Sequence, residues 1–135
     1  MAEGIMKRCF GTKIFVQSAG VKNDLEIDGF AQAVCNEIGV SLSLHRVRTF
    51  QQMEEWGDRI GSFDLIVALS PAAQLHALEY TRWHAIDVEY WPIFDPTGIG
   101  ETRDAKLSAY RQTRDQIARH IVERFGPTDQ NLPLP

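Results

Sequence analysis

The segment from Phe63 to Leu69 (FDLIVAL) is a nearly continuous apolar run, and a helix start follows it directly. Such a run is typical of a strand that is buried on both faces, as in a parallel sheet. Ser70 and Pro71 then combine a helix cap with a proline at the first helical position. Because strands that alternate with helices form parallel sheets covered by helices, this junction predicts an α/β fold.

The rest of the chain also alternates between helix and strand signals. Strands are predicted over Lys13–Ala19, Phe63–Leu69 and Ala85–Trp91. Helices are predicted over Met1–Phe10, from Asp28 to Gly39, after the capping box of Thr49 and Gln52, and from Ser70 to about Tyr80. A last, long helix is predicted from an apolar stripe of Leu107, Tyr110, Ile117, Ile121 and Phe125. This order predicts a three-layer, doubly wound parallel sheet. Such a sheet normally has four or more strands and begins with one. We therefore expect three core strands, with the first strand missing.

Length and composition limit the class of protein. The 135 residues suit one domain, which we expect over residues 1–125, followed by a disordered tail over 126–135. The net charge of −4 suggests neither a nucleic-acid partner nor an anionic membrane. No apolar run approaches the ~20 residues of a membrane-spanning helix. Two cysteines are too few for a disulfide scaffold, so we expect reduced thiols in a cytoplasmic protein.

Asp95 is the sharpest catalytic candidate. Active sites of open parallel sheets lie at the carboxyl ends of the strands, and Asp95 comes just after the predicted strand that ends at Trp91. Its loop is apolar, and desolvation there would favour a carboxyl group that donates a proton to a leaving oxygen. The alternative is that Asp95-Pro96 only turns the chain, with the carboxylate accepting a backbone hydrogen bond.

Two other places carry weaker signals. The segment from Leu42 to Arg48 contains His45 and Arg48, and it either lines an anion site or is an exposed linker. Ser18 ends a predicted strand, where its hydroxyl supports a loop or binds local backbone. His76, His84 and His120 lack metal-ligand spacing and are expected on the surface. With no glycine-rich phosphate motif either, we expect neither a metal nor a cofactor.

The sequence offers no nucleophile. Cysteine loops that cradle phosphate place an arginine six residues after the cysteine, whereas Phe15 stands six residues after Cys9 and Ser41 six after Cys35. Both cysteines lie on predicted helices, without the arginine-lined setting that makes a thiol reactive.

Five segments in the same order resemble the low-molecular-weight protein tyrosine phosphatase family, bacterial type. They are MAEG (Met1 to Gly4), like the helix start after the family's cysteine loop; QSAG (Gln17 to Gly20); IGVSLSLHRVRTF (Ile38 to Phe50); FDLIVALS; and FDP (Phe94 to Pro96), like the loop that carries the general acid. The resemblance implies hydrolysis of a phosphomonoester through a cysteinyl-phosphate. It implies that Asp95 is the general acid and that Ser18 and His45 support the phosphate loop. Arg48 matches a further arginine of the family.

The chain departs from the family because the loop cysteine and arginine are missing, so we expect the chain as given to be inactive. The opening residues suggest a phosphatase whose first strand and loop were lost to a misassigned start. A non-catalytic relative that binds a partner or an anion is the alternative, and an unrelated doubly wound domain is a third. Related arsenate reductases share the fold, but residues 67–80 hold no resolving cysteines. Without a first strand, exposed sheet edges favour a homo-oligomer.

Overall fold

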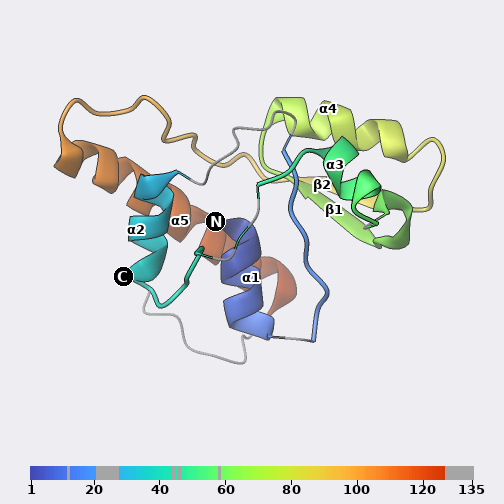
Figure 1. Cartoon of the computed structure of the whole chain (residues 1–135), viewed down its shortest axis with the longest axis horizontal. Coiled ribbons are helices and arrows are strands. Elements are labelled where there is room, and N and C mark those ends of the chain that lie inside the picture. Colours follow the sequence, from blue (N-terminus) through green and yellow to red (C-terminus); the bar gives the residue numbers. More distant parts are fainter. Residues whose placement is uncertain (12, 21–27, 44, 46, 58, 127–135) are drawn as a thin grey trace. The chain divides into compact units, whose positions relative to one another are not determined.

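The computed structural model describes residues 1–11, 13–20, 28–43, 45, 47–57 and 59–126. Its elements are, in chain order, α1 (Ala2–Phe10), α2 (Gly29–Asn36), α3 (Phe50–Glu55), the 3-10 helix η1 (Ile60–Ser62), β1 (Leu65–Ala68), α4 (Pro71–Tyr80), β2 (Asp87–Tyr90) and α5 (Arg103–Phe125) (Figure 1). The protein is thus α/β, as predicted. Apart from Gly126, the predicted tail lies outside the described residues.

The described chain forms two compact units. The first comprises Met1–Ser18, Glu26–Arg46 and Phe94–Pro135, and the second comprises Ala19–Leu25 and Val47–Ile93. The first unit therefore holds α1, α2 and α5, and the second holds α3, α4 and both strands. The single domain expected over residues 1–125 stays a prediction.

The predicted caps start the helices where the sequence places them. The Asp28 side chain accepts a hydrogen bond from the Phe30 amide at 2.8 Å, and α2 begins at the next residue. Thr49 and Gln52 form the complete capping box of α3. Ser70 accepts from the Ala73 amide at 3.2 Å and Pro71 opens α4. These contacts satisfy amides that a helix start leaves without an intrahelical partner, which fixes each boundary locally.

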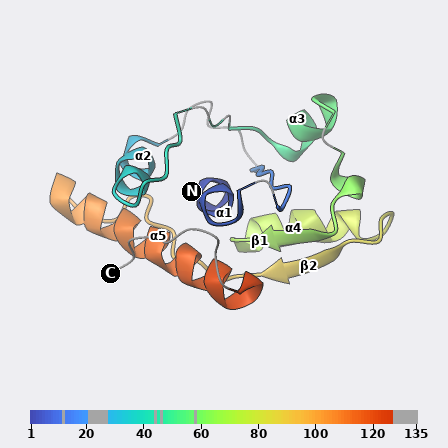
Figure 2. The same ribbon diagram turned by 90° about the horizontal axis from the view of Figure 1, so that it is seen from below.

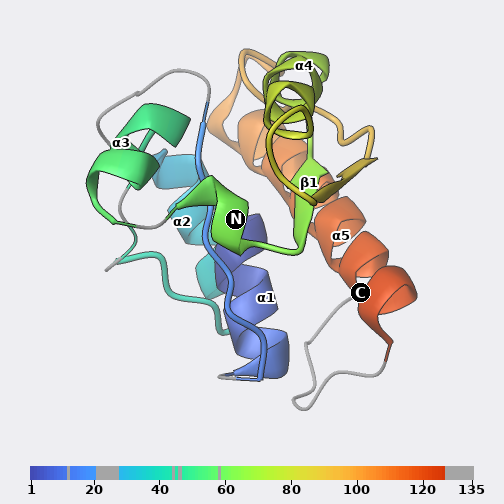
Figure 3. The ribbon, with the colours of Figure 1, turned by 90° about the vertical axis from the view of Figure 1, so that its right-hand side faces the viewer.

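In the first unit, the long helix α5 packs against both α1 and α2 (Figure 3). The core here is apolar and tightly closed: Ile5, Cys9, Val34, Cys35 and Ile121 are almost completely buried. At one end, the rings of Phe10 and Phe125 meet edge to face with centroids 6.1 Å apart. This packing stabilises the frame that carries most of the predicted site residues.

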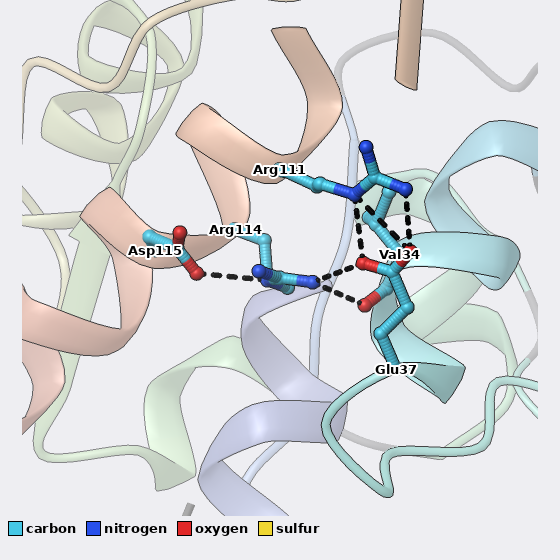
Figure 4. A network of polar contacts seen from close by, with 5 residues as sticks. All are labelled: Val34, Glu37, Arg111, Arg114 and Asp115. Atoms are coloured by element: carbon cyan, nitrogen blue, oxygen red, sulfur yellow. Dashed lines mark hydrogen bonds and ion pairs between the residues drawn. The ribbon is translucent and has the colours of Figure 1, made fainter. Parts of the chain in front are cut away.

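An arginine clamp also joins α5 to α2 (Figure 4). Arg114 is only 5% exposed, and it donates to the Val34 carbonyl oxygen at 2.8 Å, to Glu37 at 2.7 Å and to Asp115 at 2.8 Å. Arg111 binds Glu37 through two nitrogens, the shorter contact being 2.7 Å. A buried arginine needs partners for its N–H groups, and the end of α2 together with Asp115 of α5 provides them.

The second unit contains the sheet of the described chain, a parallel pair of β1 and β2 in the register Leu65↔Asp87 to Ala68↔Tyr90 (Figure 2). Both strands lie inside predicted strand segments. Helix α4 packs against them. An apolar cluster of Phe50, Met53, Ile60 and Ile86 forms the core of this unit. Among the described residues, no helix combines the length and apolar character needed to cross a membrane.

The prediction of a strand over Lys13–Ala19 is wrong. Residues 13–19 form no strand, and only Gly20 makes an isolated parallel bridge, with Thr49. At this bridge the Gly20 amide donates to the Arg48 carbonyl oxygen at 2.8 Å. Strand-forming residues need a neighbouring strand to complete a hydrogen-bonded ladder, so strand propensity alone does not create a strand. The three core strands of the prediction are therefore two in the described chain.

Candidate functional site

The predicted supporting residues Ser18 and His45 meet at the carboxylate of Glu3 in α1. The Ser18 hydroxyl donates to Glu3 Oε1 at 2.9 Å, and His45 Nδ1 lies 3.1 Å from Glu3 Oε2. Ser18 Oγ and His45 Nε2 are 3.5 Å apart. Lys7, one turn further along α1, donates to Glu3 Oε2 at 3.0 Å. These four residues form what we call the Glu3 network, which lies within the first unit.

Local structure explains why these residues meet. Gly4 follows Glu3, and a Cβ atom at Gly4 would lie 2.7 Å from a Leu42 methyl group and 2.9 Å from a Val40 methyl group. The segment that contains Val40 and Leu42 therefore approaches α1 as closely as it does because residue 4 has no side chain. The His45 amide then donates to the Leu42 carbonyl oxygen at 3.1 Å, which turns the chain and brings the imidazole to Glu3.

The Glu3 carboxylate is the charged centre of this network. Its side chain is only 10% exposed. Burial opposes its ionisation, but hydrogen bonds from His45, Lys7 and Ser18 outweigh burial and lower the pKa of Glu3 to about 2. Its place in the first turn of α1 also suits a negative charge. Sequence reasoning missed this role, since one acid at a helix start is ordinary.

A serine, a histidine and a carboxylate also make up hydrolytic triads, but this arrangement differs from one. In a triad the serine hydroxyl donates its proton to the histidine, which acts as the base. Here the Ser18 hydroxyl donates to Glu3 instead, and its contact with His45 is long. The geometry therefore holds Ser18 and His45 in place and does not activate Ser18 as a nucleophile.

Asp95 lies elsewhere in the first unit, in the loop between β2 and α5. Its side chain is exposed, and its Oδ1 accepts a hydrogen bond from the Thr97 amide at 2.9 Å. This is the turn geometry that the alternative interpretation of Asp95-Pro96 describes. Its role as a general acid stays a prediction.

Arg48 belongs to the second unit. It is 8% exposed, and its guanidinium lies 5.6 Å from the ring centroid of Trp56. An arginine above an aromatic ring gains a cation–π contact. Arg48 thus contributes to the packing of this unit, and its anion-binding role stays a prediction. The neighbouring Leu44 and Arg46 lie outside the described residues.

The thiols are placed as core residues. Cys9 and Cys35 are both free and fully buried, and burial raises the pKa of each thiol. A thiol in this setting stays protonated and is a poor nucleophile. In the described part of the chain, no three His, Cys, Asp or Glu side chains are grouped so as to hold a metal ion. His76, expected on the surface, is half-buried and stacks on Phe50 with centroids 4.6 Å apart.

Comparison of the chain with protein-family models gave no match, and comparison with curated proteins gave none either.

Proposed function

We propose that this chain is a domain of the low-molecular-weight protein tyrosine phosphatase type, with a three-layer, doubly wound sheet. In this proposal Ser18 and His45 hold a phosphate loop, and Asp95 is the general acid. The observation that carries the proposal is the Glu3 network. The resemblance gives Ser18 and His45 the same task, support of the phosphate loop. The two residues are 27 positions apart in the chain, and yet Ser18 Oγ lies 3.5 Å from His45 Nε2.

The chemistry would follow two displacements at phosphorus. A loop cysteine thiolate attacks phosphorus, the ester P–O bond breaks, and Asp95 gives its proton to the departing phenol oxygen. Water then attacks the cysteinyl-phosphate, its proton passes to Asp95, and the thiolate leaves. The 135 residues contain no Cys-x₅-Arg segment, so the chain alone should hydrolyse no phosphomonoester. The phosphorylated substrate or anion would bind only where the loop is present.

The test has two parts. The chain alone is assayed with p-nitrophenyl phosphate, and we expect no turnover above a buffer control. A fusion is then made that places the strand and Cys-x₅-Arg-Ser-Pro loop of a bacterial family member before Met1, and this fusion should turn over the ester. Asp95→Asn in the fusion should lower kcat for phenyl phosphate by about 100-fold, the usual range for a lost general acid. The loss should be smaller for p-nitrophenyl phosphate, whose leaving group needs less protonation.

Asp104→Asn, an exposed carboxylate in the first turn of α5, is the matched control and should leave kcat unchanged. A folded, active fusion in which Asp95→Asn behaves like the control would remove Asp95 from the mechanism.

A non-catalytic, phosphatase-like binding protein is the second candidate, and one observation favours it. Glu3 already supplies hydrogen-bond partners to Ser18 and His45 within the chain. The two residues are therefore satisfied without a phosphate loop. A fusion that folds but shows no turnover would favour this candidate. A cytoplasmic location and association through sheet edges are also part of the proposal, and the arsenate reductase alternative gains no support.

A further inference from the structure

Two side chains of α5 bind the peptide group on each side of Phe94, directly before Asp95. The Phe94 amide donates to Gln116 Oε1 at 2.8 Å, and the Phe94 carbonyl oxygen accepts from the Thr113 hydroxyl at 2.7 Å. Thr113 and Gln116 are three residues apart, so they lie on one face of the helix. Both backbone groups of Phe94 are thus held by one turn of α5.

This use of Thr113 is unusual for a threonine inside a helix. Such a hydroxyl commonly bonds back to a carbonyl of the preceding turn of its own helix. Thr113 is only 3% exposed, and yet its hydroxyl bond is made to the loop. The loop needs such partners because backbone polar groups that leave water must be paired. Pro92 and Pro96, on either side of Phe94, have no amide to offer.

A third residue of the same helix face lies beside the next part of the loop. Tyr110 is three residues before Thr113, and its hydroxyl donates to Asp28 Oδ2. Burial, the hydrogen bond to Asp28 and the charge of Asp28 raise the pKa of Tyr110 to about 12, with a smaller contribution from the charge of Asp95. A hydrogen bond with the Thr97 side chain acts in the opposite direction. Tyr110 is therefore a neutral phenol near Asp95 and Thr97.

Tyr110, Thr113 and Gln116 together form a row that we call the α5 ladder, and it contacts the loop from Phe94 to Thr97. We propose that the α5 ladder positions Asp95: Thr113 and Gln116 hold the preceding peptide, and Tyr110 supports the turn that follows. They are positioning residues, because they act through the loop that carries Asp95. That Asp95 is the acid of a phosphatase rests on the proposed function, whereas the holding of Asp95 does not.

The experiment uses the full chain and two pairs of variants. Thr113→Val removes the hydroxyl at nearly constant shape, and Thr113→Ser keeps it. Gln116→Met removes the acceptor, and Gln116→Glu keeps it. Amide hydrogen exchange is measured at Phe94 and Thr97, and the χ1 rotamer of Asp95 is measured from three-bond couplings by NMR. The Gln32 amide, which donates to the Asp28 carbonyl oxygen in α2, is the internal reference.

We expect Thr113→Val and Gln116→Met to speed exchange at Thr97 by about tenfold relative to Gln32, the effect of one lost hydrogen bond. The Asp95 rotamer should change from a single state to an average in these two variants. Thr113→Ser and Gln116→Glu should restore both readouts to within about threefold of the wild-type protein. A general loss of stability would speed exchange at Gln32 as well. Restoring the hydroxyl with Thr113→Ser would not reverse such a general loss.

The proposal is overturned if the Asp95 rotamer is the same in Thr113→Val as in the wild-type protein, or if Thr113→Ser is as damaging as Thr113→Val. Neither measurement needs turnover. An inactive fusion would therefore count against the phosphatase proposal and leave the α5 ladder standing, whereas unchanged couplings would count against the ladder alone.

Discussion

Glu3 and Glu37 are two carboxylates of the first unit that are held in different ways. Burial acts against ionised Glu3, and hydrogen bonds from His45, Lys7 and Ser18 outweigh it, so that the pKa of Glu3 falls to about 2. The pKa of Glu37 also falls to about 2, but here the hydrogen bond from Arg111 is the largest cause, with Arg114 adding to it. Glu37 is 39% exposed, whereas Glu3 is 10% exposed.

The difference lies in the partners and in what they can do. Arginine is always charged and binds a carboxylate with a rigid pair of N–H groups, which suits a fixed link between two helices. The partners of Glu3 include a hydroxyl and an imidazole, and each of these offers a single contact to the carboxylate. They also come from three separate parts of the sequence. A lowered carboxyl pKa alone therefore does not mark a site, and the chemistry of the partners separates the two cases.

Removing Arg114 should have the largest effect on stability. Arg114→Met leaves the Val34 carbonyl oxygen without this donor and takes a buried cation from Asp115 and Glu37. Loss of one partner from a buried ion pair should lower the free energy of unfolding by about 3 kcal/mol. Urea unfolding followed by far-UV circular dichroism measures this loss.

The matched control for this prediction is Arg111→Met. Arg111 is 42% exposed, and Glu37 keeps Arg114 when it is removed, so its loss should be clearly smaller. Far-UV circular dichroism is used because α2 and α5 are helices of the first unit. The three tryptophans, Trp56, Trp83 and Trp91, belong to the second unit, so tryptophan fluorescence would report on that unit instead. Equal stability of Arg114→Met and the wild-type protein would mean that apolar packing replaces the clamp.

Glu3→Gln should have the next largest effect, and this effect should depend on pH. Loss of the charge-assisted hydrogen bonds should cost about 2 kcal/mol at pH 7. The pKa of Glu3 in the folded protein, about 2, is below its ordinary value of 4.5. The carboxylate therefore stabilises the fold fully above about pH 4.5, and this contribution is lost as the pH falls towards 2.

Urea unfolding at pH 7, 4 and 3 tests the sign. The gap in unfolding free energy between the wild-type protein and Glu3→Gln should narrow as the pH falls. Glu123→Gln, which changes an exposed carboxylate of α5, serves as the control. A gap that is as wide at pH 3 as at pH 7 would show that Glu3 acts through shape and not through its charge.

The sequence predicted those parts of the fold that depend on near neighbours. The caps at Asp28, Thr49 and Ser70 are interactions across two or three residues, and each helix begins where its cap predicts. The strand predicted over Lys13–Ala19 was wrong because a strand depends on a partner far away in the chain. β1 and β2 are strands because each completes the hydrogen-bonded ladder of the other.

The candidate site shows the same limit. Asp95 was singled out by its place after a predicted strand, and the resemblance added roles for Ser18 and His45. These two partners of Glu3 lie 15 and 42 residues away from it, beyond any local pattern. One signal was readable. The apolar stripe of α5 runs through Tyr110 and Ile117, and the helical position between them is Arg114, which is buried. A polar residue inside an apolar stripe indicates a specific partner, and Arg114 and its neighbour Thr113 both have one.

The smallest effect should come from Lys7, the exposed member of the Glu3 network. Lys7 is 51% exposed, and it follows Glu3 by four residues, the favourable order for such a pair in a helix. Lys7→Met should cost about 0.4 kcal/mol at low salt, and the cost should nearly vanish at about 1 M salt, since screening weakens exposed pairs. Lys7→Arg keeps the charge and should be neutral. A loss as large as that of Glu3→Gln would make the network a surface ion pair with no special part for Ser18 and His45. The Glu3 network would then be held, like the arginine clamp, by its charged partner alone. A small, salt-sensitive loss leaves the partly buried bonds from Ser18 and His45 as the reason that Glu3 stays charged.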